Sequence, residues 1–343
     1  MAPPIDAVLL IAFGGPEKPE DVRPFLANVT RGRPIPPARL EEVARHYEVM
    51  GGRSPLTELT FRQADALRAR LRTEGIALPV YVGMRNWAPY LQETLRAMAA
   101  DGIRSALGLI LSAHQTEASW ERYQANVDEA RARVGTGAPA VRYTPGWFDR
   151  PGFIEATADH VREPLARIPA AERHAAPLVF TAHSVPVAMA ETSPYVAQVT
   201  ESSRLVAARL GEPPWSIAYQ SRSGRPQDPW LEPDAGEEIR RLAAAGACHV
   251  VVAPIGFVCD HVEVLYDLDV EARRIAEGCG VGFHRAPTVC DHPAFIAMLA
   301  DLVREALPAS ALPPPGERVR GDVDGTRPSP RPAGWTGEGA SLP

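Results

Sequence analysis

The order of the short apolar segments constrains the fold of this chain more than any other feature. In each half of the sequence, four such segments alternate with longer stretches that have helical periodicity. The segments are rich in β-branched residues, which is typical of strands covered on both faces. This alternation predicts parallel sheets with right-handed crossovers. The expected strands are residues 7–13, 79–83, 106–111 and 140–143 in the first half, and 178–182, 216–219, 249–253 and 281–284 in the second.

The two halves also match in detail, because AVLLIAFGGP and PLVFTAHSVP are each an apolar strand followed by a small-residue turn with proline. We therefore predict an α/β fold of two similar Rossmann-like lobes, residues 1–150 and 151–308. Each lobe would be a parallel four-stranded sheet flanked by helices, with a cleft where the carboxyl ends of the strands converge. Neither lobe carries G-x-G-x-x-G or G-x-x-x-x-G-K-[ST], which argues against a dinucleotide or P-loop site.

Helices are expected between the strands and after the last one. Asp291 is a candidate N-cap and Pro293 a first-turn residue of a closing helix, residues 294–307. Beyond it, residues 309–343 are rich in proline, glycine and arginine with almost no apolar period, which predicts a disordered tail. The other expected helices are residues 60–75, 90–101, 118–134, 195–210, 235–246 and 264–278.

Composition narrows the class of protein. The chain has 343 residues, 23% charged and 45% apolar, as in a soluble globular protein. The net charge of -6 argues against a nucleic-acid partner, and no run of about 18 apolar residues predicts a membrane span. The N-terminus lacks the features of a signal peptide, so we expect a cytoplasmic protein. The four cysteines form no C-x-x-C pair, so no zinc or redox motif is indicated and free thiols are expected.

The stretch from Pro254 to Glu271 places acidic residues where a core would be expected to continue. Residues 249–254 read as a buried strand, Gly256 as the turn after it, and the residues after Asp260 as a helix. Glu263, Asp267 and Glu271 are spaced by four, which aligns three carboxylates on one helix face. A solvated acidic face would explain them, but their apolar neighbours favour a cation site or a proton relay.

His183 follows the first strand of the second half and is therefore expected to point into the same cleft as Glu263. A lone histidine beside a strand is more often structural, but imidazole at a strand's carboxyl end suits proton transfer and divalent metal binding. Ser184 has no G-x-S-x-G context, which argues against a hydrolase. His114 occupies the corresponding loop of the first half, where lining the cleft and a structural hydrogen bond are about equally supported.

Aromatic residues gather in the same loops and suit a flat apolar ligand, although core packing would explain any one of them. Arginines after the first strand could bind the carboxylates of such a ligand. A solvated loop would account for these arginines equally well. The aromatic residues are Phe13, Tyr47, Trp87, Trp120, Tyr123, Trp230 and Tyr266, and the arginines are Arg31, Arg33 and Arg53.

Taken together, these stretches resemble the ferrochelatases, most closely the compact soluble form of Gram-positive bacteria. The match runs in order from about residue 7 to residue 307. TAHSVP and GFVCDHVEVLYDLD are its specific pair. The matching stretches are AFGGPEKPEDV, RGRPIP, HYEVMGGRSPL, GMRNWAPYL, TAHSVP, QSRSGRPQDPWLEPD and PIGFVCDHVEVLYDLDVEA.

The resemblance implies Fe(II) insertion into a porphyrin in haem biosynthesis, with coproporphyrin III favoured and protoporphyrin IX possible. His183 matches the family's site histidine and metal ligand, and Glu263 matches the acid that faces it across the porphyrin. Asp267 and Glu271 match an acidic row that carries protons or metal. Four further positions, Phe13, Arg31, Ser54 and Tyr123, match residues that contact the macrocycle.

The sequence departs from the compact form at three positions. Phe13 stands where a tyrosine that can ligate the product iron is often found, and Thr30 and His46 stand where arginines can occur. The resemblance implies no required cofactor, since iron is a substrate. Some relatives carry a 2Fe-2S cluster on cysteines, but the tail of this chain has none, so we expect no cluster. A monomer is expected.

Two other functions stay open at this stage. A chelatase for another metal or tetrapyrrole, such as a cobaltochelatase, would share the architecture but usually relies on more than one site histidine. A non-catalytic tetrapyrrole-binding protein would clamp a ligand between its lobes and would need no proton relay.

Overall fold

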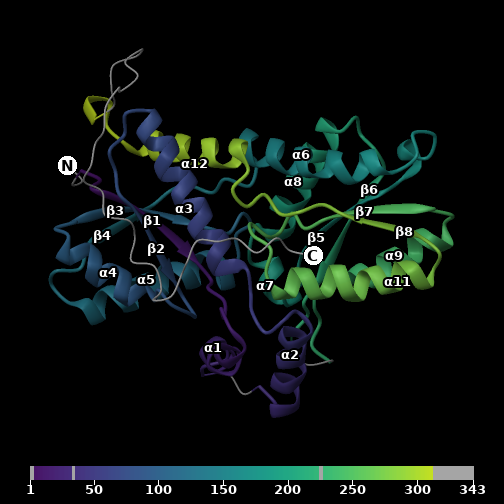
Figure 1. Cartoon of the computed structure of the whole chain (residues 1–343), viewed down its shortest axis with the longest axis horizontal. Helices are drawn as coiled ribbons and strands as arrows, with labels where there is room; N and C mark the ends of the chain where they lie inside the picture. Colours follow the sequence, from purple (N-terminus) through teal and green to yellow (C-terminus); the bar gives the residue numbers. More distant parts are fainter. Residues whose placement is uncertain (1–3, 33–34, 224–226, 312–343) are drawn as a thin grey trace.

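Two parallel sheets form the centre of the molecule in a computed structural model that describes residues 4–32, 35–223 and 227–311 (Figure 1). The first sheet has the order β2-β1-β3-β4 and the second the order β6-β5-β7-β8, so the repeat predicted from the sequence is confirmed. Every strand pair is parallel. The strands are β1 (Ala7–Ala12), β2 (Val80–Met84), β3 (Ser105–Ile110), β4 (Ala140–Tyr143), β5 (Leu178–His183), β6 (Trp215–Gln220), β7 (His249–Ala253) and β8 (Gly282–Arg285).

Helices connect the strands and cover both sheets. Their apolar faces carry the buried residues, as amphipathic helices on a two-sided sheet require. In the first half they are α1 (Val22–Val29), α2 (Pro37–Val49), α3 (Leu56–Thr73), α4 (Leu91–Ala100) and α5 (Arg122–Val134). In the second half they are α6 (Pro151–Arg167), α7 (Val187–Glu191), α8 (Tyr195–Arg209), α9 (Ala235–Ala244), α10 (Val262–Val264), α11 (Arg273–Gly278) and α12 (Pro293–Ala306).

Short helices of other types complete the fold. Two are π-helices, η2 (Glu117–Glu121), which leads into α5, and η4 (Leu265–Ala272), which joins α10 to α11. The 3-10 turns are η1 (Pro19–Asp21), η3 (Arg173–Ala175) and η5 (Ala309–Ala311). The segment predicted to be a disordered tail, residues 309–343, thus begins with a 3-10 turn, and residues 312–343 lie outside the described residues.

One hydrophobic cluster runs through both sheets. Leu10 and Val82 of the first sheet belong to the same buried cluster as Phe180 and Val251 of the second. Helix α12 packs against both α6 and α3, along the upper edge of the view in Figure 1, and contributes Phe295 to this cluster. The two lobes therefore share a core, and the boundaries predicted for them at residues 150 and 308 stay predictions.

Several helix ends differ from the sequence predictions. His292, not Asp291, is the N-cap of α12: its Nδ1 accepts a hydrogen bond from the Ala294 amide at 3.2 Å. The Asp291 carboxylate pairs with Arg62 of α3 instead. Pro293 is the first helical residue, as predicted. The helix predicted from residue 60 begins four residues earlier, at Leu56, directly after Pro55.

Helices α1 and α2 were not predicted. They lie between β1 and α3 and form a separate pair at the lower edge of Figure 1. Among the described residues, no helix combines the length and the apolar composition needed to cross a bilayer.

Candidate active site

His183 is the last residue of β5, where its ring leaves the sheet at the carboxyl end. Its Nδ1 lies 2.5 Å from the Ser184 carbonyl oxygen, and its own carbonyl accepts a hydrogen bond from the Tyr195 hydroxyl at 2.8 Å. A carbonyl oxygen can only accept, so Nδ1 carries the proton. In the neutral imidazole Nε2 then holds the lone pair and is the atom free to take a proton or bind a metal.

Glu263 faces that nitrogen. Its Oε2 lies 3.8 Å from His183 Nε2, beyond direct hydrogen-bond distance, and 36% of the His183 side chain and 47% of the Glu263 side chain are exposed. Gly256 makes this approach possible, because a Cβ there would lie 2.6 Å from the Ala182 Cα. The turn after β7 can therefore lie directly on the end of β5, and the Gly256 amide donates to the Thr181 carbonyl at 3.0 Å. The structure thus brings together the two residues that the sequence predicted as a pair.

The acidic residues behind Glu263 lie on a π-helix, not on the α-helix that was predicted. Glu263 is on α10, and Asp267 and Glu271 are on η4. Hydrogen bonds in a π-helix run from i to i+5, so four residues make slightly less than one turn. Residues spaced by four still lie on one side of such a helix, and the predicted row of carboxylates is retained.

Asp267 is the most strongly perturbed acid of this row. Its Oδ2 accepts hydrogen bonds from Ser221, after the end of β6, and from Gln220 Nε2 at 3.4 Å. Burial raises the pKa of Asp267 to about 7, and the charges of Glu263 and Glu271 add to the rise while the Ser221 hydroxyl opposes it. This carboxyl can therefore bind and release a proton near neutral pH.

Glu271, at the outer end of the row, is exposed. Burial raises its pKa, and the charges of Asp234 and Glu42 contribute, whereas Arg39 acts in the opposite direction. Glu42 and Arg39 belong to α2, so the outer end of the row faces an element of the first half of the chain.

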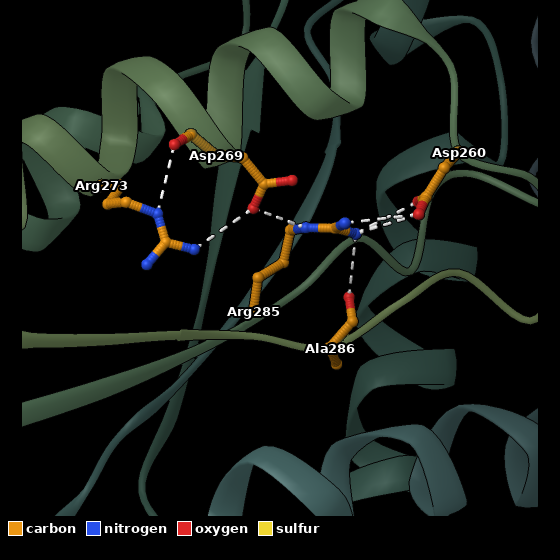
Figure 2. Close-up of polar contacts among 5 residues, drawn as sticks. All are labelled: Asp260, Asp269, Arg273, Arg285 and Ala286. Carbon is orange, nitrogen blue, oxygen red and sulfur yellow. Dashed lines mark hydrogen bonds and ion pairs between the residues drawn. The ribbon is translucent and has the colours of Figure 1, made fainter. Parts of the chain in front are cut away.

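A network of ion pairs fixes the segment that carries these acids (Figure 2). Arg285, at the end of β8, donates from Nε to Asp269 Oδ1 at 2.8 Å and from Nη1 to Asp260 Oδ1 at 3.1 Å. Asp260 precedes α10, and Asp269 lies within η4. Burial alone would lower the pKa of Arg285, but Asp260 and Asp269 outweigh it and raise the pKa. Arg285 therefore holds the loop before Glu263 and the π-helix after it in one arrangement.

Helix α2 packs against the same segment. The His46 ring stacks on Tyr266 of η4, with centroids 3.8 Å apart and planes at 11°. Tyr47 lies in one hydrophobic cluster with Val262 of α10 and Phe25 of α1. Burial raises the pKa of Tyr47, and the charge of Glu263 adds to the rise. The α1–α2 pair, missed in the sequence, is therefore part of the wall beside Glu263.

The Arg85 guanidinium lies near the aromatic rings of both Phe13 and Tyr123. The Arg85 guanidinium carbon lies 5.6 Å from the Phe13 ring centre and 4.4 Å from that of Tyr123, and Arg85 Nε donates to Asn126 Oδ1 at 2.7 Å. Phe13 also packs on the cluster that contains Val262. Arg85 was not predicted from its residue type, although it lies in GMRNWAPYL, one of the matching stretches. Tyr123 is buried on α5, not at a loop mouth, because η2 and α5 turn it into the core.

The remaining predicted residues have separate surroundings. Ser54 is buried against the turn after β1, where a Cβ on Gly15 would lie 2.8 Å from the Ser54 Cβ. Arg31 is exposed after α1 and donates from Nη2 to Asn28 Oδ1 at 2.5 Å. Arg33 lies outside the described residues. His114 has the structural role: it is buried, and its Nε2 lies 3.1 Å from Ser202 Oγ.

One small cavity of the described parts borders the site segment and is lined by Pro254, Ile255 and Phe257. Another, of about 380 Å³, is lined by Arg150, Glu155 and Met298 on α6 and α12. Among the described residues, no group of three or more His, Cys, Asp or Glu side chains is placed to hold a metal ion, and the four cysteines are free thiols. The cleft expected where the carboxyl ends of the strands converge stays a prediction. The expected absence of a 2Fe-2S cluster also stays a prediction.

Residues 5–307 match the family model described as ferrochelatase. The chain belongs to the ferrochelatase family. A coproporphyrin III ferrochelatase of Nocardia farcinica is 47% identical over 311 residues, which cover 88% of each chain. A protein of the same name from Streptomyces coelicolor is 45% identical over 322 residues, 89% of this chain and 86% of the relative. A Rhodopirellula baltica ferrochelatase is 44% identical over 306 residues, 89% of this chain and 87% of the relative.

Solved structures agree on the architecture. SirB from Bacillus subtilis, solved with Fe3+, has a TM-score of 0.55 at 11% identity and covers 89% of this chain and 97% of its own. DR2241 from Deinococcus radiodurans is a multi-domain protein with structural similarity to chelatases. It has a TM-score of 0.51 at 17% identity, and the match covers 89% of this chain and 55% of DR2241. At such identities the likeness concerns the fold. The fold class and the family predicted from the sequence motifs are both confirmed.

Polar residues at the carboxyl end of β6 are the part of the site that reasoning from single residues missed. Gln220 and Ser221 hold Asp267, and Ser221 does so with a left-handed φ of 60°. Residues with side chains rarely adopt this conformation, and such residues are enriched at functional sites. The run QSRSGRP directly after a strand was the signal that could have identified them.

Proposed function

We propose that this protein is a ferrochelatase that inserts Fe(II) into coproporphyrin III. The observation that carries the proposal is the orientation of His183: its Nδ1 proton faces a carbonyl oxygen, so its Nε2 lone pair faces Glu263 across 3.8 Å. The relatives named coproporphyrin III ferrochelatase support the choice of porphyrin.

The reaction exchanges two pyrrole N–H protons for one ferrous ion. His183, when its ring is neutral, accepts a pyrrole proton at Nε2, a role typically worth roughly 10²–10⁴-fold in rate. Glu263, opposite, would bind the incoming ion together with His183, and one nitrogen with one oxygen suits a transient ligand set better than a permanent cage. Iron is a substrate here, and no resident cofactor is needed for this step.

Asp267 and Glu271 would connect the pair with solvent. Asp267, with a pKa raised to about 7, can take a proton from the site and pass it outward, and Glu271 stands at the exposed end of the row. The same carboxylates could guide hydrated iron inward. On the macrocycle side, the porphyrin would contact the four positions that match the family, Phe13, Tyr123, Ser54 and Arg31. Arg85 lies near both aromatic rings and would be a further cation there. The enzyme would act in the cytoplasm, as a monomer.

Anaerobic Fe(II) insertion, followed by the Soret shift, tests the proposal with coproporphyrin III and protoporphyrin IX side by side. We expect turnover with coproporphyrin III, and a loss of at least about 10²-fold in His183→Ala because the proton acceptor is gone. His174→Ala is the matched control, since His174 is exposed on η3, outside the site. It should keep the rate of the parent protein.

Three outcomes would contradict the proposal. An active His183→Ala enzyme would exclude a central role for this residue. Binding of both porphyrins without turnover would indicate a tetrapyrrole carrier. Insertion of Co(II) into a reduced tetrapyrrole, with no Fe(II) insertion into either porphyrin, would indicate a different chelatase.

A further inference from the structure

Two of the four cysteines meet, although the sequence shows no paired motif. The sulfur atoms of Cys259 and Cys290 lie 3.9 Å apart, although the two residues are 31 positions apart in sequence. Both are free thiols, and the other two, Cys248 and Cys279, are exposed. A disulfide requires the two sulfurs to be neighbours before they react, and this pair meets that requirement.

The backbone holds the two cysteines side by side. The Cys290 amide donates to the carbonyl of Val258, the residue before Cys259, at 2.8 Å. Gln63 Nε2 of α3 donates to the Cys290 carbonyl at 2.8 Å. Cys290 has a left-handed φ of 39°, which a residue with a side chain keeps only where its surroundings fix it. The contact between the sulfurs is therefore built into the fold.

The two thiols differ in their access to solvent. Cys259 is buried, and burial raises its pKa well above the usual range, so it stays protonated and is a poor first nucleophile. Cys290 is half-buried, so solvent reaches it more readily than it reaches Cys259. An oxidant from solution would thus meet Cys290 first, with Cys259 behind it.

We propose that Cys259 and Cys290 are a redox modification site that peroxides convert to a disulfide. The Cys290 thiolate attacks one peroxide oxygen, the O–O bond breaks, and hydroxide leaves and takes up a proton to form water, so that Cys290 becomes a sulfenic acid. The Cys259 sulfur then attacks the Cys290 sulfur, the S–O bond breaks, and a second water carries away the oxygen and the Cys259 proton. Two thiols are oxidised, one peroxide is reduced to two waters, and a dithiol reductant reverses the change.

The disulfide would act on the site through the segment that follows Cys259. Asp260 comes next and binds Arg285, and Glu263 lies four residues on. The sulfurs must move from 3.9 Å to about 2.05 Å, so the loop or its partner must shift. Positioning of a catalytic group within a fraction of an ångström affects rate, and the oxidised protein should therefore insert iron several-fold more slowly. This second step rests on the proposed function, whereas the modification itself does not.

The test uses the full chain treated with hydrogen peroxide, followed by alkylation of the remaining thiols and mass spectrometry. We expect two of the four thiols to disappear, the mass to fall by two hydrogen atoms, and one cross-linked peptide pair to contain Cys259 and Cys290. Dithiothreitol should restore all four thiols. The double variant Cys248→Ser/Cys279→Ser should still form the link, and Cys290→Ser should not. Four free thiols after treatment, or a link through Cys248 or Cys279, would overturn the proposal.

Iron insertion by the Cys248→Ser/Cys279→Ser variant tests the effect on the site. The oxidised form should be several-fold slower and recover with reductant, and Cys290→Ser should not respond to peroxide. A disulfide that forms without changing the rate would refute the effect on the site loop. A reduced protein that inserts iron into neither porphyrin would contradict the proposed function and leave the thiol result standing.

Discussion

Glu263, Asp267 and Glu271 have the same spacing in the sequence, but the fold gives them different surroundings. Glu263 and Glu271 are exposed, whereas Asp267 is half-buried beneath Ser221 and Gln220. Desolvation disfavours the charged form of an acid, so the middle residue is the one with a pKa near 7. The spacing could be read from the sequence. The difference in pKa between the three acids could not be read from the sequence, because it depends on the contact of Gln220 and Ser221 with Asp267 of η4.

Asp267→Asn should show this difference in pKa as a pH-dependent difference in stability. The pKa is 3.8 for an ordinary aspartate and about 7 in the folded state, so the native protein holds a proton that the unfolded chain releases between these values. The stabilising contribution of Asp267 is fully present below the lower pKa and is lost as the pH rises through the higher one. The asparagine variant cannot titrate. Relative to it, the parent protein should lose roughly 2 kcal/mol between pH 4 and pH 8, less than the full shift because the carboxyl is only half-buried.

Urea unfolding of both proteins at several pH values in this window measures the difference. Altered contacts of Ser221 or Gln220 in the variant would shift the free energy of unfolding by the same amount at every pH. The prediction concerns how the difference in free energy of unfolding between the two proteins changes with pH. A difference that stays constant across the window would mean that Asp267 ionises like an exposed acid.

At the scale of elements, Arg285 connects the loop before α10 with the π-helix after it. Its side chain is 14% exposed, and that of Asp260 is 12% exposed. Removing one partner of a buried pair leaves an uncompensated charge, which costs far more than a surface ion pair contributes. Arg273 contacts the same Asp269 but is 42% exposed. The two arginines therefore form a matched pair that separates a buried from a surface interaction.

Arg285→Met should lower the free energy of unfolding by about 3–5 kcal/mol, because Asp260 and Asp269 lose their common cation. Arg273→Met should lower it by less than about 1 kcal/mol. Chemical denaturation of the two variants at neutral pH measures both values. Equal costs would mean that the network of Figure 2 does not hold the site segment.

The elements also show where sequence reasoning succeeded. All eight strands of the described part of the chain were predicted within two residues of their observed ends, because apolar β-branched runs between helical stretches have few alternatives in a two-sided sheet. Several features escaped prediction, helices α6 and α7 among them. Helices α1 and α2 pack their apolar faces against each other and against Val262, which is far away in the sequence. The sequence alone does not indicate this contact. The π-helix η4 has the composition of an α-helix, so the sequence does not distinguish the two, and in the fold its Tyr266 stacks on His46 of α2.

At the scale of the whole molecule, the two sheets share one hydrophobic cluster, although each sheet also has a smaller cluster of its own. The cluster that contains Leu10 and Phe180 is completed by α12, which packs on α3 of the first half and α6 of the second. Two similar lobes in the sequence suggested two folding units. A shared core implies instead that loss of packing at α12 weakens both sheets, because each loses contacts with the same side chains.

Phe295→Ala tests this coupling. Phe295 is fully buried on α12, with its ring centroid 5.5 Å from that of Trp147 and 6.4 Å from that of Phe153. Truncation of a buried phenylalanine typically costs about 3–5 kcal/mol. Hydrogen exchange under mildly destabilising conditions should show that amides of β1 and β5 lose protection by the same amount, since one cooperative unit opens.

Val49→Ala is the control, because the Val49 side chain is 62% exposed. This substitution should leave the protection of β1 and of β5 unchanged within about 0.5 kcal/mol. If β5 loses protection while β1 keeps it, the lobes unfold independently despite the shared cluster.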